Sequence, residues 1–270
     1  TGSDYTQPVE NPADQMDTLG EKPEILIVED NEELRQFLMK ELGEKYHVKP
    51  AEDGELAMDM AYQGIPDLII TDVRMPGMNG FDLCKAIKSD IRTSHIPVIM
   101  LTAKNTIYDQ IKGTETGADA YFTKPFHLKL LVTKINQLIH SRRKLYKQFS
   151  QDVYLMPAKM AESEMDQKFL QQIIDYVIQN ISHRQLNVEE LSNKMNLSRS
   201  NFYRKLKALT GESPIEFIRN IRLKQAIKLM ENQEFTITEI AYRTGFSSSS
   251  YFTKMFRRKY GKPPSEFIES

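Results

Sequence analysis

Residues 68–80 read Leu-Ile-Ile-Thr-Asp-Val-Arg-Met-Pro-Gly-Met-Asn-Gly, and this stretch decides the fold. Its apolar start is short and is followed by turn-forming residues, a pattern typical of a buried strand in a parallel sheet. Ligands of open α/β sheets bind at the carboxyl ends of the strands, so Asp72 is the first candidate for a functional group. An aspartate after a strand is also a common turn residue, and the rest of the chain has to decide between the two roles.

Apolar runs and helical patterns alternate around this stretch. The runs that predict strands are 25–28, 47–50, 67–71, 96–101 and 120–123, and the helical patterns are 32–42, 54–63, 80–89, 105–113 and 127–140. Five strands that alternate with five helices predict an α/β fold, a doubly wound, five-stranded parallel sheet with right-handed crossovers.

The composition is that of a globular protein whose two parts carry opposite charge. Of the 270 residues, 40% are hydrophobic and 27% are charged, and no apolar run is long enough to span a membrane. The formal charge is −9 over residues 1–140 and +8 over residues 141–270, which together give the −1 of the whole chain. This asymmetry favours an acidic site in the first part and a polyanionic partner for the second, although it can also serve solubility alone. The single cysteine, Cys84, excludes an internal disulfide and fits a reducing compartment.

The same patterns predict the domain boundaries. We expect a flexible leader over residues 1–22, an α/β domain over 23–140, a linker over 141–165 and an all-α domain over 166–270. Asp166 is expected to cap the first helix of the all-α domain. The chain starts with Thr-Gly-Ser and without methionine, which indicates a piece of a longer protein.

The all-α part contains an internal repeat. A short helix, a tight turn and a second helix are predicted at about 188–210 and again at about 237–260, and a long helix over 214–231 joins them. Helix-turn-helix is the physical interpretation of each unit. In the second helix of each unit, apolar residues share one stripe and polar residues share another. The polar stripes consist of Ser200, Tyr203, Arg204 and Lys207 in the first unit, and of Ser249, Ser250, Lys254 and Arg257 in the second.

These polar stripes predict contacts with DNA. Arginine pairs with guanine in the major groove, and lysine and arginine bind phosphates. Serines 247–250 stand at a helix start, where hydroxyl and main-chain N–H groups suit a phosphate. A solvated cationic face and a simple capping stretch are the alternatives that the pattern leaves open.

Polar side chains follow four of the predicted strands, namely Glu29 with Asp30, Asp72, Thr102 and Lys124. The carboxyl ends of parallel strands lie along one edge of a sheet, so we expect these side chains to converge. Three carboxylates repel one another unless a cation binds, and an all-oxygen ligand set suits Mg²⁺. A lysine and a threonine hydroxyl beside them suit a phosphoryl group transferred to Asp72 as an aspartyl-phosphate. Each residue alone could also be a helix cap or a solvated charge.

This part of the chain resembles the flavodoxin-like receiver domains of two-component response regulators. The resemblance rests on residues 28–30, 72–80, 101–103 and 117–126, and it covers about residues 23–140. It implies that Asp72 accepts a phosphoryl group from a phosphohistidine. The implied Mg²⁺ ligands are Glu29, Asp30, Asp72 and the main-chain carbonyl of Arg74; Lys124 and Thr102 would bind the phosphoryl oxygens; and Tyr121 would be an aromatic switch that turns inward when Thr102 moves.

The second part resembles the DNA-binding domain of the AraC/XylS family. Residues 188–191, 198–207, 211–214 and 237–264 carry this resemblance, which covers about residues 185–268. It implies two helix-turn-helix units in tandem whose recognition helices enter successive major grooves, about 10 bp apart. The implied DNA-binding residues are Arg199, Ser200, Tyr203, Arg204, Lys207, Ser249, Ser250, Lys254 and Arg257.

Together the two resemblances imply a phosphorylation-controlled DNA-binding transcription regulator. Phosphate on Asp72 would act through Thr102 and Tyr121, promote a homodimer and raise DNA affinity by avidity. Residues 154–181 with such a DNA-binding part resemble the tail of hybrid two-component sensors, which are attached to the inner membrane. The partner would then be a histidine kinase domain of the same polypeptide, and its activity would lie outside these residues.

Three alternatives stay open from the sequence. A free-standing cytoplasmic response regulator would have the same two parts. An aspartate-nucleophile phosphatase-like enzyme would share the acidic site, although no second acid or base is apparent, and we expect this chain itself not to be an enzyme. A ligand-controlled activator would need a sugar-binding β-domain, which the first part does not show.

Overall fold

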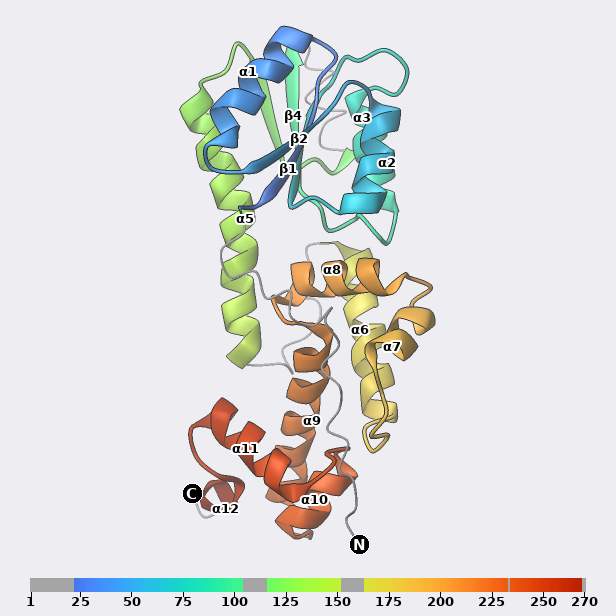
Figure 1. Ribbon diagram of the computed structural model, residues 1–270, viewed down its shortest axis with the longest axis vertical. Coiled ribbons are helices and arrows are strands. Elements are labelled where there is room, and N and C mark those ends of the chain that lie inside the picture. The colour runs from blue at the N-terminus through green and yellow to red at the C-terminus, as the bar shows by residue number, and fades with distance from the viewer. Residues whose placement is uncertain (1–21, 104–115, 152–162, 233, 269–270) are drawn as a thin grey trace, which may run out of the picture.

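The computed structural model describes residues 22–103, 116–151, 163–232 and 234–268 (Figure 1). An α/β unit comes first and an all-α unit follows. The α/β unit consists of β1 (Glu24–Val28), α1 (Glu32–Gly43), β2 (His47–Ala51), α2 (Gly54–Gly64), β3 (Leu68–Asp72), α3 (Gly80–Ser89), β4 (Val98–Ala103), β5 (Ala120–Lys124) and α5 (Leu128–Gln151). The leader up to residue 21 and the helix expected at 105–113 lie outside the described residues.

All strand pairs of the sheet are parallel, and their order is β2-β1-β3-β4-β5. This order confirms the predicted doubly wound sheet. Pro50 lies in β2, an edge strand, where the missing N–H of proline is tolerated. Side chains alternate between two fully covered faces. Leu26, Ile69 and Met100 pack toward α2 and α3, whereas Ile27 and Ile70 pack toward α1 and α5, and Figure 1 shows these helix pairs on opposite sides of the sheet.

Two elements differ from their predicted bounds. The strand expected at 96–101 begins at Val98 and ends at Ala103, since Pro97 has no N–H to donate to a neighbouring strand. The helix expected to end at His140 continues to Gln151. Residues 141–151 contain neither glycine nor proline, so nothing in the sequence ends the helix there.

The all-α unit contains two similar halves on a shared helix. Its helices are α6 (Glu164–Gln179), α7 (Val188–Lys194), α8 (Arg199–Thr210), α9 (Pro214–Glu231), α10 (Ile237–Arg243), α11 (Ser249–Tyr260) and α12 (Pro264–Ile268). Leu191, Phe202 and Phe217 are buried in the first half, and Ile240 and Phe252 are buried in the second. The aliphatic and aromatic positions of α9 contribute to both cores.

The two predicted recognition helices, α8 and α11, are built in the same way. A serine side chain, Ser198 or Ser248, accepts a hydrogen bond from a main-chain N–H of the first turn and caps each helix. A glycine in the left-handed region, Gly211 at φ 72° or Gly261 at φ 81°, ends each one. The helix-turn-helix repeat predicted from the sequence is therefore present in the structure.

The cap predicted for α6 is wrong. Ser163 occupies the cap position and its hydroxyl accepts a hydrogen bond from the Asp166 N–H, so Asp166 lies inside the first turn. A serine followed three positions later by an acidic residue is a common pattern at the start of a helix. The sequence alone does not show whether an acidic residue is the cap or lies three positions after it. The Asp166 side chain is buried and accepts hydrogen bonds from the hydroxyl groups of Ser163 and Ser94.

The second half contains a half-buried lysine, Lys259, whose ammonium nitrogen is buried. The Lys259 ammonium nitrogen has no hydrogen-bond partner among the described residues, and burial lowers its pKa to about 8. The buried Glu212 carboxylate, whose own pKa is raised by burial, attracts it without a hydrogen bond between them. Burying an ammonium group without a partner is unfavourable.

We expect Lys259→Met to raise the free energy of unfolding by about 1 kcal/mol at pH 7, because the apolar side chain needs no partner. The advantage should shrink as the pH rises above 8. Native Lys259 loses its proton there, whereas an unfolded lysine keeps its proton to a pKa of about 10.4, so the wild type gains stability in that range. Urea denaturation at pH 7 and pH 9.5 measures the effect. Lys254→Met, at an exposed position of the same helix, is the control and should change stability little.

Candidate phosphoryl site and nucleic-acid interface

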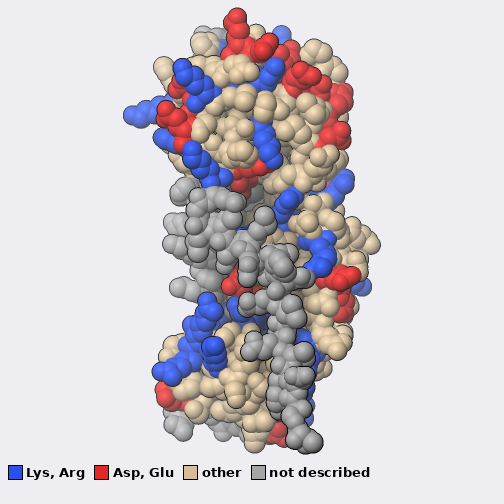
Figure 2. All heavy atoms as spheres, in the orientation of Figure 1, with Lys and Arg blue, Asp and Glu red and all other residues tan. Residues whose placement is uncertain are grey.

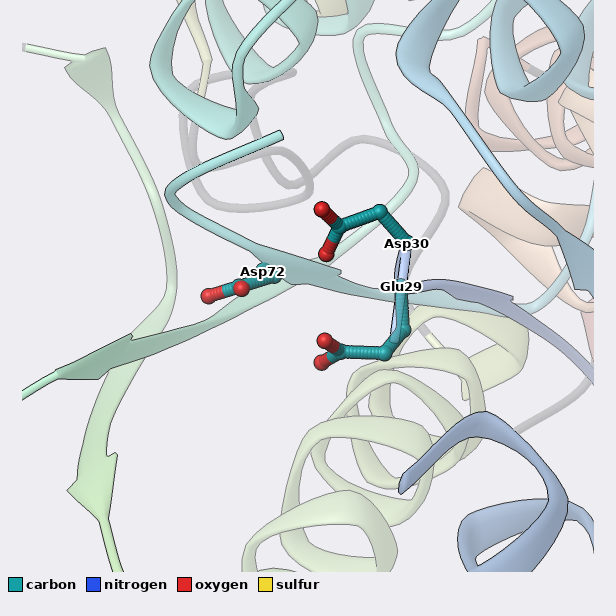
Figure 3. A group of neighbouring side chains, drawn as sticks. All are labelled: Glu29, Asp30 and Asp72. Carbon is teal, nitrogen blue, oxygen red and sulfur yellow. The ribbon is translucent and has the colours of Figure 1, made fainter. Parts of the chain in front are cut away.

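Three carboxylates meet at the carboxyl edge of the sheet. Glu29 and Asp30 follow β1, and Asp72 ends β3, the strand paired with β1. One carboxylate oxygen of each residue lies within 4.8 Å of those of the other two. Figure 3 shows the Glu29 and Asp30 carboxylates extending toward the side on which Asp72 lies. Glu29 is 1% exposed and Asp72 is 8% exposed, while Asp30 faces solvent. The predicted convergence of these residues is observed.

Lys124 holds two of these carboxylates. Its ammonium nitrogen lies 2.8 Å from Glu29 Oε2 and 3.0 Å from Asp72 Oδ2. Burial raises the pKa of Glu29, and the hydrogen bond from Lys124 opposes that rise. One ammonium group cannot neutralise three carboxylates, so the site keeps excess negative charge that favours a divalent cation.

The loop after β3 fixes the position of Asp72. The Val73 N–H donates to Asp72 Oδ1 at 2.7 Å, which orients the carboxylate. The start of α3 then packs closely against the end of β3. A Cβ atom at Gly80 would lie 2.1 Å from the Asp72 carbonyl oxygen. Only glycine allows this close approach. Gly77, at φ 70°, makes the turn between them.

The predicted switch residues lie on β4, which pairs with the strand of Asp72, and on β5, the strand beyond it. Thr102 is buried near the end of β4, and its hydroxyl donates to the Ala103 carbonyl at 3.2 Å. Tyr121 on β5 is half-buried, its hydroxyl oxygen lies 3.2 Å from the Thr116 hydroxyl oxygen, and burial raises its pKa. Arg74 is exposed in the loop after Asp72. The roles of these three residues stay predictions.

The outward face of α11 forms a cationic depression. Its lining contains the predicted Ser249, Ser250, Lys254 and Arg257 together with Thr253 and Arg258, and no acidic residue. Figure 2 shows Lys and Arg side chains gathered over this end of the molecule. Thr253 and Arg258 are not in the predicted set, and they lie four positions after Ser249 and Lys254. Extending the polar stripe by one helical turn finds both.

The outward face of α8 is not equally open. Arg199 and Ser200 are exposed, and Lys207 lies over the Tyr203 ring with 5.7 Å between its nitrogen and the ring centroid. The Arg204 guanidinium, however, donates to the main-chain carbonyl of Gln63 at 2.6 Å. Gln63 belongs to α2, so this predicted base-reading side chain contacts the α/β unit.

Two family models match the chain, each over one of its units. Residues 25–136 match the response regulator receiver domain, and residues 191–270 match a helix-turn-helix domain. The chain combines a receiver domain with an AraC-type helix-turn-helix domain. These are the two domains that the sequence predicted.

Relatives match this chain over different lengths. Histidine kinase P4 of Formosa agariphila is 39% identical over 96% of the chain, which spans 19% of that protein. Response regulator PleD of Caulobacter vibrioides is 42% identical over 42% of the chain, which spans 25% of that protein. The receiver domain of a signal transduction histidine kinase from Syntrophus aciditrophicus is 36% identical, over 44% of this chain and 91% of that one, with a TM-score of 0.43. The chain thus spans a quarter or less of the two curated relatives.

Proposed function

We propose that phosphorylation of Asp72 by a histidine kinase controls DNA binding by this response regulator. One observation carries the proposal: three carboxylates and Lys124 converge at a sheet edge in a chain that also has two helix-turn-helix units. Asp72 would attack the phosphorus of a phosphohistidine, so that the P–N bond breaks and an O–P bond to Asp72 forms. The Val73 N–H already orients the carboxylate for this attack.

Glu29, Asp30, Asp72 and the Arg74 carbonyl would hold Mg²⁺, which neutralises charge on the transferred phosphoryl group. The donor set fits, since all its atoms are oxygens and the carboxylates are close together. Lys124 would exchange its bond to Asp72 for one to a phosphoryl oxygen. The Thr102 hydroxyl would turn toward the same group, and Tyr121 would move into the space that it leaves.

The DNA-binding residues that we propose follow the predicted set, with Arg199, Ser200, Tyr203, Arg204 and Lys207 on α8 and Ser249, Ser250, Lys254 and Arg257 on α11. The 18 residues of α9, the helix that joins the two units, span about 27 Å. That length is close to one turn of DNA, about 34 Å, which supports binding in successive major grooves.

The partners and location that we propose depend on the relatives. Similarity to a histidine kinase along nearly the whole chain supports a kinase domain in the same polypeptide. A phosphorylated homodimer would bind DNA with higher avidity. Among the described residues, no helix combines the length and the apolar character needed to cross a bilayer. We place the chain in the cytoplasm, attached to the inner membrane if its parent is a hybrid sensor, and we assign it no enzyme activity of its own.

Activation by a phosphate mimic tests the proposal. The full chain is titrated against a pool of random-sequence duplexes, with and without beryllofluoride and Mg²⁺, and the bound fraction is sequenced. We expect tighter binding and selection of a sequence motif in the activated sample. Equal affinity and no selected motif in both samples would contradict phosphorylation-controlled DNA binding.

A substitution on α11 separates phosphate contacts from base contacts. We expect Arg257→Ala to weaken binding to all duplexes alike and to lower the slope of log affinity against log salt by about 1, because one phosphate contact is lost. Fluorescence anisotropy at several salt concentrations measures the slope. Arg184→Ala removes an exposed arginine outside the depression and should leave the slope unchanged. Loss of affinity for a single sequence only would show that Arg257 reads a base.

A further inference from the structure

We propose that the receiver domain docks on α8 and competes with DNA for this recognition helix, held by a buried cluster of Ser94, Asp166 and Lys205. The proposal rests on the DNA-binding role proposed for α8 and adds how that helix is regulated. Figure 1 shows α8 directly beneath the α/β unit, with α10 to α12 at the far end of the molecule. Helix α5 of the receiver also contacts α8.

The cluster joins the two domains through a hydroxyl group. Ser94, in the segment between α3 and β4, accepts a hydrogen bond from the Lys205 ammonium at 3.0 Å and donates one to Asp166 Oδ1 at 2.7 Å. Lys205 also pairs directly with Asp166. The second Asp166 oxygen accepts from the Ser163 hydroxyl at 2.7 Å.

Receiver residues lie in and beside this buried cluster. Lys205 is 0% exposed, and Asp166 and Ser94 are each 3% exposed. A buried ion pair is tolerated when further hydrogen bonds satisfy it, and the Ser94 hydroxyl supplies two of them. Ile91 of the same receiver segment packs against the apolar core of the first helix-turn-helix half. The interface is therefore both polar and apolar.

The receiver contacts the side of α8 that would contact DNA. Arg204 is next to Lys205 in the chain, and its guanidinium is bonded to the receiver at the Gln63 carbonyl. A recognition helix fills the major groove with its side chains against the base edges, so Arg204 cannot hold the receiver and a base at once. The cationic face of α11 stays exposed. In the docked state, α11 is therefore accessible to DNA and α8 is covered by the receiver.

The contact lies away from the phosphoryl site. Gln63 precedes β3 and Ser94 precedes β4, so both lie at the amino edge of the sheet, whereas Asp72 lies at the carboxyl edge. The phosphoryl group therefore does not touch the interface. Release of α8 requires a shift in the equilibrium between docked and free states.

A receiver-side substitution tests the docking without altering any proposed DNA contact. Ser94→Arg in the full chain places a bulky cation beside Lys205, and Ser89→Arg adds the same charge at an exposed position of α3. Amine acetylation followed by mass spectrometry compares Lys205 with the exposed Lys40. We expect Lys205 to react more slowly than Lys40 in the wild type and in Ser89→Arg, and to approach the rate of Lys40 in Ser94→Arg. Equal rates in the wild type would overturn the docking.

DNA affinity tests the competition. If the free state is about a tenth of the molecules, undocking should tighten binding to a random-sequence 30-bp duplex at low salt about 10-fold. We expect this for Ser94→Arg relative to Ser89→Arg. Equal affinity despite a reactive Lys205 would overturn the competition. Absence of binding by every variant would overturn the DNA-binding role and the competition with it, while the Lys205 rates would still report the docking.

Hydrogen exchange of the wild type provides a test that does not depend on the folding of a variant. The N–H groups of Thr93, Ser94 and Ile96 are hydrogen-bonded within the docked segment. We expect saturating duplex to accelerate exchange in this segment, although it is not in contact with DNA, and to leave the α1 amides unchanged. Unchanged exchange of the segment at saturation would overturn the competition.

Discussion

Asp72→Asn is expected to abolish phosphorylation of this chain completely. An amide oxygen lacks the negative charge of the nucleophile, so no O–P bond forms with acetyl phosphate or with a phosphohistidine donor. The fold should be retained, because the Val73 N–H can donate to the amide oxygen as it does to Asp72 Oδ1. Removing one of three neighbouring carboxylates also reduces their repulsion. Intact mass spectrometry after incubation with acetyl phosphate and Mg²⁺ measures the phosphate adduct.

Asp30→Asn is the matched control, since it removes an exposed carboxylate of the same site. We expect this variant to need more Mg²⁺ and to reach the wild-type extent of phosphorylation when enough is supplied, because Asp72 is unchanged. Excess Mg²⁺ should not rescue Asp72→Asn. A phosphate adduct on Asp72→Asn, located by peptide mapping to another residue, would show that Asp72 is not the acceptor.

The convergence of the acidic side chains and Lys124 was predictable from sequence, because strands that follow one another along the chain end at the same edge of a parallel sheet. Glu29, Asp72 and Lys124 each come at a strand end, and the carboxyl ends of parallel strands share one edge. The observed ion pairs of Lys124 with Glu29 and Asp72 follow from that geometry without knowledge of distant contacts. The repeat of helix-turn-helix units was predictable for a similar reason, since caps and apolar stripes are local patterns.

The domain interface was not predictable, because its residues have no shared pattern in the sequence. Arg204 and Gln63 are 141 positions apart, and the acceptor is a main-chain carbonyl that every residue type carries. Lys205 lies among polar residues of α8 and resembles a solvated lysine, yet it is fully buried. Asp166 resembles a helix cap. A buried polar cluster between domains forms only when the domains dock. Hydrophobic periodicity along the sequence gives no information about docking.

The end of α5 shows a second limit of sequence analysis. The apolar spacing of the helix weakens after Ile139, and the prediction placed the domain boundary there. The helix nevertheless continues to Gln151, because residues 141–151 contain neither glycine nor proline, the residues that disfavour a helix most. The receiver domain and its connection to the next domain thus share one helix.

Asp166→Ala is expected to destabilise the all-α unit by about 3–5 kcal/mol, because the Lys205 ammonium would stay buried without its carboxylate. Far-UV circular dichroism during urea denaturation measures the loss. Asp175→Ala is the matched control. It removes an exposed aspartate of the same helix, whose side chain accepts a hydrogen bond from Gln171, and should cost less than about 0.5 kcal/mol.

The double variant Asp166→Leu/Lys205→Met distinguishes two roles of the buried pair. An apolar pair of similar volume is often as stable as a buried ion pair, so we expect the double variant to regain most of the stability that Asp166→Ala loses. It should not regain docking, because Ser94 would lose both of its partners across the interface. If stability is restored and the receiver is released, the role of the ion pair is to hold the two domains together. A double variant as unstable as Asp166→Ala would show instead that the pair is required for the fold of the all-α unit.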